Sequence, residues 1–337
     1  MKTILVTGGA GYIGSHTLVE LLNNNYNVVV VDNFSNSKPL VLKRVEQITN
    51  KKIKFYEENI LNKEALDKIF DENKIDACIH FAGYKAVGES CEKPLMYYNN
   101  NIVGTLVLLE VMKKHNCKNL IFSSSATVYG NPHTVPITED FPLSTTNPYG
   151  TTKLFIERIL EDLYKSDNSF NIGILRYFNP IGASKTGLIG EDPNGKPNNL
   201  CPYITKVLFG KLEKLYIFGN DYPTPDGTGV RDYIHVEDLA MGHRLALDKL
   251  FASSGLYKVN LGTGKGYSVL EIVKTFEKVS GKKIPYEFSS RRSGDIPTCY
   301  ADITKAKEFL GFEPKNTLED MAKDAINFQL KNPDGII

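Results

Sequence analysis

The stretch TGGAGYIGSH, residues 7–16, decides the fold. It follows the apolar run ILV and precedes a segment with the residue spacing of a helix. Its glycines fit both GxxGxxG (Gly8, Gly11, Gly14) and GxGxxG (Gly9, Gly11, Gly14). Glycines at this spacing permit a tight turn, a close approach of the backbone to a pyrophosphate, and close packing of helix on strand. The stretch therefore predicts a dinucleotide site, although taken alone it also fits a glycine-rich turn without a ligand.

An acidic residue follows at the distance that a dinucleotide site requires. Asp32 ends the next apolar run, 18 residues after Gly14. A carboxylate at the end of the second strand accepts hydrogen bonds from a ribose 2′-hydroxyl and repels a 2′-phosphate, so the sequence favours NAD over NADP. The alternative is that Asp32 is only a turn residue in VDNFS.

The first half of the chain alternates apolar runs with segments of helical periodicity. This alternation predicts a doubly wound parallel Rossmann sheet of the α/β class, covered by helices on both faces. The texture changes at about residue 180, where a stretch rich in Pro, Gly and Asn begins. We expect residues 1–179 to form an NAD-binding domain and residues 180–337 mainly a smaller mixed α/β substrate domain, with some segments returning to the first. The expected strands are 3–7, 28–31, 53–56, 77–80 and 119–123, and the expected helices lie near 13–24, 39–49, 62–72, 95–115 and 151–165.

Composition excludes several classes of partner. Forty Lys and Arg residues against 39 Asp and Glu residues give a formal net charge of +1, which argues against a nucleic-acid or anionic-membrane partner. The five cysteines are dispersed without a CxxC pair, which is typical of a reducing compartment. The apolar run at the N-terminus is too short for a signal peptide, and none reaches the roughly 18 residues of a membrane span. We expect a cytoplasmic protein without a metal ion.

A tyrosine and a lysine stand four residues apart in NPYGTTK, residues 147–153. Tyr149 and Lys153 could be a surface pair on one helix face. However, Ser125 stands just after the fifth predicted strand, at the sheet edge where ligands of doubly wound folds bind. A lysine ammonium at roughly 5 Å contributes about 3 kcal/mol toward lowering the pKa of a phenol, so the pair can also handle a proton.

The glycine turn, the strand-end serine and the YxxxK pair together resemble the extended short-chain dehydrogenase/reductase family. The resemblance implies that Tyr149 is the acid/base, that Lys153 supports it and that Ser125 hydrogen-bonds the reacting oxygen. Dehydratases of this family carry Asp-Glu directly after the serine, where this sequence has Ala126 and Thr127. Neither side chain can protonate a leaving hydroxyl, which disfavours elimination.

Further segments resemble the UDP-glucose 4-epimerases within that family. They are HFAGYKAVGES (80–90), PNNL (197–200), GTGVRDYIHVEDLA (227–240) and RRSGDIPTCYAD (291–302). The resemblance implies interconversion of UDP-glucose and UDP-galactose in galactose metabolism. In that reaction bound NAD takes the hydride from C4, the 4-keto sugar turns over, and the hydride returns to the other face. It also implies a homodimer paired through helices at about 95–115 and 151–165.

The same resemblance assigns the residues of two binding sites. Family members usually have Asp where Asn59 stands, and an amide can still hydrogen-bond the adenine. Arg231 and Arg292 suit a diphosphate, although each could equally be a solvated surface arginine. The NAD site would comprise Gly8, Gly11, Tyr12, Ile13, Gly14, Asp32, Asn33, Asn36, Ser37, Asn59, Ile60, Phe81, Ala82, Lys85, Asn100, Ser125, Tyr149, Lys153 and Tyr177. The UDP-sugar site would comprise Lys85, Ser125, Tyr149, Phe178, Asn179, Asn199, Leu200, Tyr216, Phe218, Arg231, Arg292, Asp295 and Cys299.

Cys299 departs from the bulky tyrosine of many bacterial family members. Relatives that also accept N-acetylated sugars have a small residue there, so we expect activity on UDP-GlcNAc and UDP-GalNAc as well. The alternative is that Cys299 only packs, and that neighbouring side chains still narrow the pocket. Two other functions stay open at this point, namely another NAD-dependent epimerase, such as one acting on UDP-glucuronate, and a non-catalytic NAD sensor.

Overall fold

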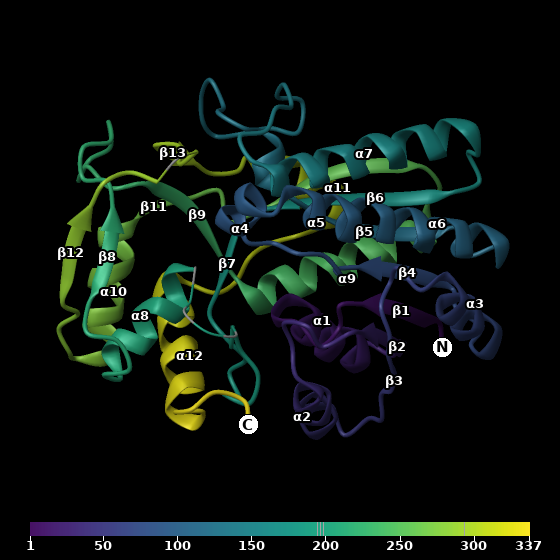
Figure 1. Ribbon diagram of the computed structural model, residues 1–337, viewed down its shortest axis with the longest axis horizontal. Coiled ribbons are helices and arrows are strands. Elements are labelled where there is room, and N and C mark those ends of the chain that lie inside the picture. The colour runs from purple at the N-terminus through teal and green to yellow at the C-terminus, as the bar shows by residue number, and fades with distance from the viewer. Residues whose placement is uncertain (194, 196, 198, 293) are drawn as a thin grey trace.

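A computed structural model describes residues 1–193, 195, 197, 199–292 and 294–337 (Figure 1). Its larger part is a seven-stranded sheet in the order β10-β6-β5-β4-β1-β2-β3. All of the pairings between neighbouring strands are parallel. The strands are β1 (Thr3–Thr7), β2 (Asn27–Asp32), β3 (Lys54–Glu57), β4 (Ala77–His80), β5 (Asn119–Ser125), β6 (Asn171–Tyr177) and β10 (Leu256–Leu261).

Helices cover both faces of this sheet, as predicted for a doubly wound fold. Alternate residues of a strand enter different cores: Ile4 and Val6 pack with one set of helices, and Leu5 packs with the other. This period of two follows from the pleat of a strand, and both faces are apolar because both are covered. The first set is α1 (Tyr12–Asn23), α2 (Pro39–Thr49) and α9 (Val236–Ala252), and the second is α3 (Lys63–Glu72), α6 (Gly104–Lys114) and α7 (Pro148–Ser166).

One predicted helix is wrong in its continuity. Instead of a single helix over 95–115, the chain forms α5 (Pro94–Tyr97), a π-helical turn η1 (Tyr98–Val103) and then α6. The π-turn contains Asn101, which is buried and bonds both backbone groups of Tyr84 and the hydroxyl of Thr152. The wider turn thus places an amide inward where it joins two other segments, and such turns are common near functional sites.

The remaining elements form a smaller mixed region, drawn at the left of Figure 1. Strand β9 is central in it, because β7, β11 and β13 all pair with it. Its apolar core includes Ile204, Ile217, Phe276 and Met321. Its elements are β7 (Asn179–Ile181), α8 (Leu200–Leu208), β8 (Leu215–Phe218), β9 (Val230–His235), β11 (Gly266–Ser268), α10 (Val269–Ser280), β12 (Tyr286–Ser289), β13 (Thr298–Cys299) and α12 (Leu318–Lys331).

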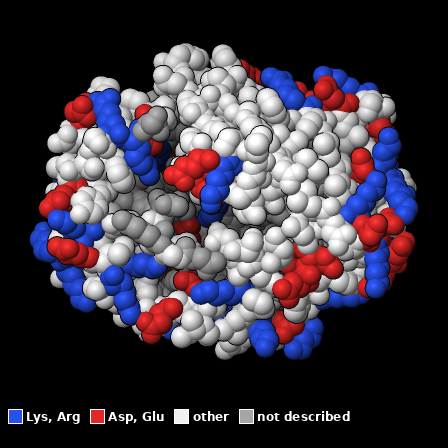
Figure 2. All heavy atoms as spheres, in the orientation of Figure 1, with Lys and Arg blue, Asp and Glu red and all other residues white. Residues whose placement is uncertain are grey.

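Three short helices complete the described chain. They are α4 (Val87–Glu92), η2 (Ala126–Val128) and α11 (Thr304–Leu310). Within the described ranges, no helix combines the length and apolar character needed to cross a membrane. Figure 2 shows acidic and basic side chains interspersed on the face drawn, in line with the near-zero net charge.

Candidate active site

The glycine turn between β1 and α1 is closed too tightly for side chains. Gly8 has a φ of 69°, and a Cβ on it would lie 2.8 Å from the backbone nitrogen of Ala82. A Cβ on Gly14 would lie 2.4 Å from the carbonyl oxygen of Gly8. Gly11 is the N-cap of α1 and offers no side-chain cap to its first-turn N–H groups. This open helix N-terminus fits the pyrophosphate of a dinucleotide.

The end of β2 is organised around the carboxylate of Asp32. It accepts hydrogen bonds from the Ala10 nitrogen (3.0 Å), the Phe34 nitrogen (2.9 Å) and the Ser37 hydroxyl (2.8 Å). A carboxylate has about four lone-pair positions, so one position is left for a ribose hydroxyl. Asn59 lies just past β3 and uses its Oδ1 to accept from the Leu61 nitrogen (2.9 Å), which leaves its NH₂ group as the donor available for an adenine.

Strand β5 and helix α7 bring the three predicted catalytic residues together. Ser125 is the last residue of β5, and α7 begins at Pro148, so Tyr149 stands in its first turn. Asn147 caps this helix by accepting a hydrogen bond from the Gly150 nitrogen (2.8 Å). Tyr149 hydrogen-bonds Ser125, and the Lys153 ammonium lies 6.0 Å from the centre of the Tyr149 ring.

Three successive serines at the end of β5 have three different partners. The Ser123 carbonyl accepts from Lys153 Nζ (2.8 Å), and its hydroxyl contacts the Tyr177 hydroxyl. The Ser124 hydroxyl donates to Glu157 (2.6 Å) on the other face of the sheet. Ser125 Oγ accepts from Thr127, through its nitrogen (3.2 Å) and its hydroxyl (3.0 Å). Since Ser125 accepts two bonds from Thr127, its own proton remains to be donated to Tyr149 or a substrate oxygen.

Burial shifts the pKa values of both Tyr149 and Lys153. Burial raises the pKa of Tyr149, and the hydrogen bond with Ser125 only partly opposes this. Burial also lowers the pKa of Lys153 to about 8, against the opposing effect of Glu157. Burial thus disfavours the charged form of both side chains.

Several of the predicted UDP-sugar residues lie on or near β8, β9 and β13. Arg292 forms an ion pair with Asp295 (2.8 Å), and its guanidinium lies 4.9 Å from the centre of the Phe218 ring. Arg231 on β9 is the register partner of Cys299 on β13. Cys299 is 8% exposed and packs in one cluster with Phe178, so the small region meets the end of β6 there.

Two further predicted ligand residues share a carboxylate that the sequence did not single out. Glu191 accepts from the Lys85 ammonium (3.3 Å) and from the Asn199 side-chain amide (2.5 Å). Asn199 is also the N-cap of α8. Glu191 thus joins a residue assigned to both sites to one assigned to the UDP-sugar site. The only hint of Glu191 in the sequence was the prediction of Lys85 as a ligand residue, because a lysine ammonium is commonly balanced by a carboxylate.

The other predicted residues lie on the segments that border these groups. Tyr12 donates its hydroxyl to the Gly182 carbonyl (2.8 Å), and Ile13 packs on the core next to α2 and α9. The Asn100 amide donates to the Asn101 side chain (2.9 Å). Asn33 and Asn36 are exposed after β2, Ile60 is buried after β3, Phe81 and Ala82 follow β4, Asn179 begins β7, Leu200 begins α8, and Tyr216 lies half-exposed on β8.

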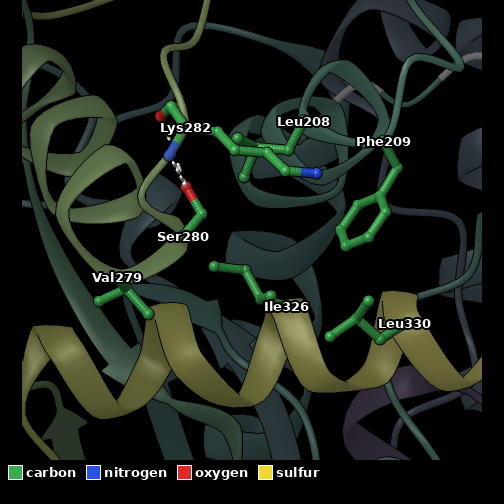
Figure 3. Close-up of a pocket in the computed structure, with 7 residues that line it drawn as sticks. All are labelled: Leu208, Phe209, Val279, Ser280, Lys282, Ile326 and Leu330. Carbon is green, nitrogen blue, oxygen red and sulfur yellow. Dashed lines mark hydrogen bonds between the residues drawn. The ribbon is translucent and has the colours of Figure 1, made fainter.

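A separate apolar hollow of about 300 Å³ lies between α8, α10 and α12. Figure 3 shows Ile326 and Leu330 on α12 facing Leu208 and Phe209 across it. None of the predicted site residues lines this hollow, so we do not assign it to the active site.

The parallel sheet, the glycine turn and the Ser125–Tyr149–Lys153 set define the class as an extended short-chain dehydrogenase/reductase. The family model described as GDP-mannose 4,6 dehydratase matches residues 5–325. A UDP-glucose 4-epimerase of Bacillus subtilis (strain 168) is 62% identical over 332 residues, which is 98% of this chain and 98% of that protein. The chain belongs to the UDP-glucose 4-epimerase family.

Solved structures give the same assignment. UDP-glucose 4-epimerase from Bifidobacterium longum, crystallised in complex with NAD⁺ and UDP, is 56% identical with a TM-score of 0.97, and the match covers 99% of this chain and 100% of that one. The UDP-Glc/GlcNAc 4-epimerase from Campylobacter jejuni is 36% identical with a TM-score of 0.85, over 98% of this chain and 100% of that one.

Proposed function

We propose that this protein interconverts UDP-glucose and UDP-galactose with NAD as a resident cofactor. The observation that carries the proposal is the meeting of Ser125, Tyr149 and Lys153 at the carboxyl end of β5, on the same sheet edge as the glycine turn after β1. Ligands bind at this edge of doubly wound sheets. The identity to proteins named UDP-glucose 4-epimerase supports the choice of reaction within the class.

The three residues have distinct roles in the proposed reaction. Tyr149 takes the proton of the sugar 4-hydroxyl and later returns it, and Ser125 donates a hydrogen bond to the same oxygen. Lys153 stabilises the ionised tyrosine. The glycine turn and Asp32 would hold NAD, which would supply the hydride chemistry at C4 that inversion through a 4-keto sugar requires. Ala126 and Thr127 supply no acid for elimination, which distinguishes the proposed reaction from dehydration.

The two regions of the chain bind different ligands in this proposal. We assign the NAD site to residues 1–179 and the UDP-sugar site mainly to residues 180–337. Arg231 and Arg292 would hold the diphosphate with their guanidinium groups. A firm hold on UDP and a loose hold on the sugar allow the 4-keto intermediate to present both faces without being released.

The assay that tests the proposal is a coupled measurement of UDP-glucose formation from UDP-galactose, using purified protein without added NAD. Turnover is expected, because a resident NAD that is regenerated in each cycle stays bound during purification and the assay. No turnover, even after NAD is supplied, would refute the proposed function.

The small side chain of Cys299 supports a wider substrate range that includes UDP-GlcNAc and UDP-GalNAc. Cys299 is a small side chain packed against Phe178, and the 36%-identical relative is named a UDP-Glc/GlcNAc 4-epimerase. We expect wild-type turnover of UDP-GalNAc. We expect Cys299→Tyr to lower it at least tenfold while changing UDP-galactose turnover less than threefold, since only the 2-acetamido group needs the space. Equal effects on both substrates would contradict this role.

An exposed apolar face supports a homodimer. Leu95 on α5 is 81% exposed, and Phe155 on α7 is 50% exposed and stacks on Tyr98. Val103 and Leu106, further along the helical run that contains Leu95, are also exposed, and Figure 2 shows few charged side chains over α5 and α6. Such a patch fits an interface with a second copy. We also propose a cytoplasmic location, which the five free cysteines support. Light scattering on the purified protein tests the dimer.

A further inference from the structure

A fully buried ion pair joins helix α7, which carries Tyr149 and Lys153, to strand β6, which pairs with β5. Glu157 on α7 and Arg176 on β6 both have no exposed side-chain surface. Arg176 Nη2 donates to Glu157 Oε2 (2.6 Å), and its Nε donates to Glu157 Oε1 (3.0 Å). This two-point contact is the strongest geometry for a guanidinium and a carboxylate. Two charges in such a position are costly to desolvate, and apolar residues often stabilise a core as well or better.

The pair is placed next to each part of the reacting centre. Glu157 stands one helical turn after Lys153. Its Oε1 also accepts from the hydroxyl of Ser124, the residue before Ser125. Arg176 precedes Tyr177, and the strand register pairs Ser124 with Arg176 and Ser125 with Tyr177. One carboxylate therefore ties together the helix and the two strands that carry the predicted site.

Bonds from the arginine extend the network to the loop that follows Ser125. Arg176 Nη1 donates to the Tyr129 hydroxyl (3.0 Å) and to the Glu139 carbonyl (3.1 Å). The Tyr129 hydroxyl donates to the side chain of Asn260 on β10 (2.6 Å). Asn260 in turn donates to the Ile137 carbonyl (2.8 Å). Each of these side chains has a partner, so the network is held in one arrangement.

We propose that Glu157 is a positioning residue for the epimerase reaction. Through its bonds to Ser124 and Arg176 and its place on α7, it holds Ser125 and Lys153 in position relative to Tyr149. This inference rests on the proposed function. Glu157 touches neither the reacting atoms nor the predicted cofactor residues directly, so it acts through the groups that it fixes.

The charge of Glu157 supports the same role. Burial lowers the pKa of Lys153, and the negative charge of Glu157 is the effect that opposes it. His80 on β4 also lies near Lys153, but burial lowers its pKa to about 3, so it adds no charge. Of the groups that act on Lys153 among the described residues, Glu157 is thus the acidic one that favours the ammonium form.

The test compares Glu157→Gln with Glu161→Gln on the same helix. Glu161 is also largely buried and ion-paired, with Lys258 and Arg158, but lies one turn further from Lys153. We expect Glu157→Gln to lower kcat for UDP-galactose at least 30-fold, with KM and bound NAD within threefold of wild type. We expect Glu161→Gln to leave kcat within twofold, although both variants lose an ion pair and some stability.

A third variant separates positioning from folding. Ser124→Ala removes one hydrogen bond to Glu157, leaves the ion pair intact, and should lower kcat about threefold to tenfold. Unchanged kcat in Glu157→Gln would overturn the proposal. If Glu157→Gln does not fold, unchanged kcat in Ser124→Ala overturns it. A loss of kcat in Glu161→Gln equal to that in Glu157→Gln would reduce the effect to general stability and also overturn it. Failure of the wild type itself to turn over UDP-galactose would instead refute the proposed function.

Discussion

The predicted reacting centre and the proposed clamp, by which we mean the basic residues Lys85, Arg231 and Arg292 predicted for the UDP-sugar site, hold their polar groups in different ways. Around Ser125, Lys153 and Glu157 the polar groups are buried and bonded to one another. In the clamp, Arg292 is 54% exposed and pairs with an aspartate three residues away on the same loop. Lys85 is likewise 49% exposed where it meets Glu191. The groups of the centre are buried and bonded to one another, whereas Arg292 and Lys85 in the clamp are exposed side chains that each form an ion pair.

From this contrast we infer that the centre determines the rate and that the clamp determines the affinity for the substrate. Buried, mutually bonded groups need little rearrangement during a reaction, so they can stabilise a transition state. Exposed ion pairs contribute little to stability and can be exchanged for contacts with a ligand. We therefore expect substitutions in the centre to change kcat and substitutions in the clamp to change KM.

The largest effect is expected for Tyr149→Phe. Loss of the acid/base should lower kcat about 10³-fold, within the range for a general acid or base, while UDP binding stays within threefold of wild type. Steady-state assays and titration with UDP measure the two quantities. Tyr164→Phe, on the same helix but far from the site, is the matched control and should retain full activity. A Tyr149→Phe enzyme with wild-type kcat would remove Tyr149 from the mechanism.

A smaller effect, on KM rather than on kcat, is expected for Arg292→Leu. Losing a charge-assisted contact with the diphosphate should raise KM about 30-fold, or about 2 kcal/mol, and leave kcat within threefold. Arg291→Leu is the control, because Arg291 is the adjacent arginine but pairs with Asp221 and lies over the Tyr222 ring. Equal effects of the two substitutions would show that general positive charge, rather than Arg292 itself, binds the substrate.

The smallest expected effect is on the free energy of unfolding and concerns a single buried histidine, His16 on α1. Burial lowers the pKa of His16 to about 4. Between that value and about 6.5 the unfolded chain binds a proton that the folded chain does not, so stability falls as the pH drops through this window. From pH 7 to pH 5 this histidine should account for about 2 kcal/mol of the lost free energy of unfolding.

Denaturant titrations at the two pH values measure that loss. His16→Gln should show a smaller drop between pH 7 and pH 5 than the wild type. His133→Gln changes an exposed histidine and should show the same drop as the wild type. If His16→Gln and the wild type lose equal stability, the buried histidine does not contribute to acid sensitivity.

Sequence patterns predicted the frame of the molecule well because its signals are local. The strands at 3–7 and 77–80 have the predicted bounds, and α2 also spans the predicted residues. The break in the helix over 95–115 was missed, because it depends on where Asn101 bonds across the fold. Whether an apolar periodic segment is continuous cannot be read from its periodicity alone.

Groups that act through distant partners were beyond the reach of the sequence. In the run of three serines only Ser125 was singled out, since identical residues differ only in which face of the strand they lie on. Glu157 and Arg176 stand 19 residues apart, and neither belongs to a motif. An arginine in an apolar strand was the one available hint, because a buried charge requires a partner.

The measurement that tests the account most directly follows the hydrogen at C4. UDP-galactose carrying deuterium at C4 is converted by the purified protein, and the product is examined for the label. If Tyr149 handles only the hydroxyl proton and the hydride goes to NAD and back, the deuterium remains at C4 of UDP-glucose. Replacement of the deuterium by hydrogen from water would contradict the account, because C4 would then be inverted by proton exchange with solvent.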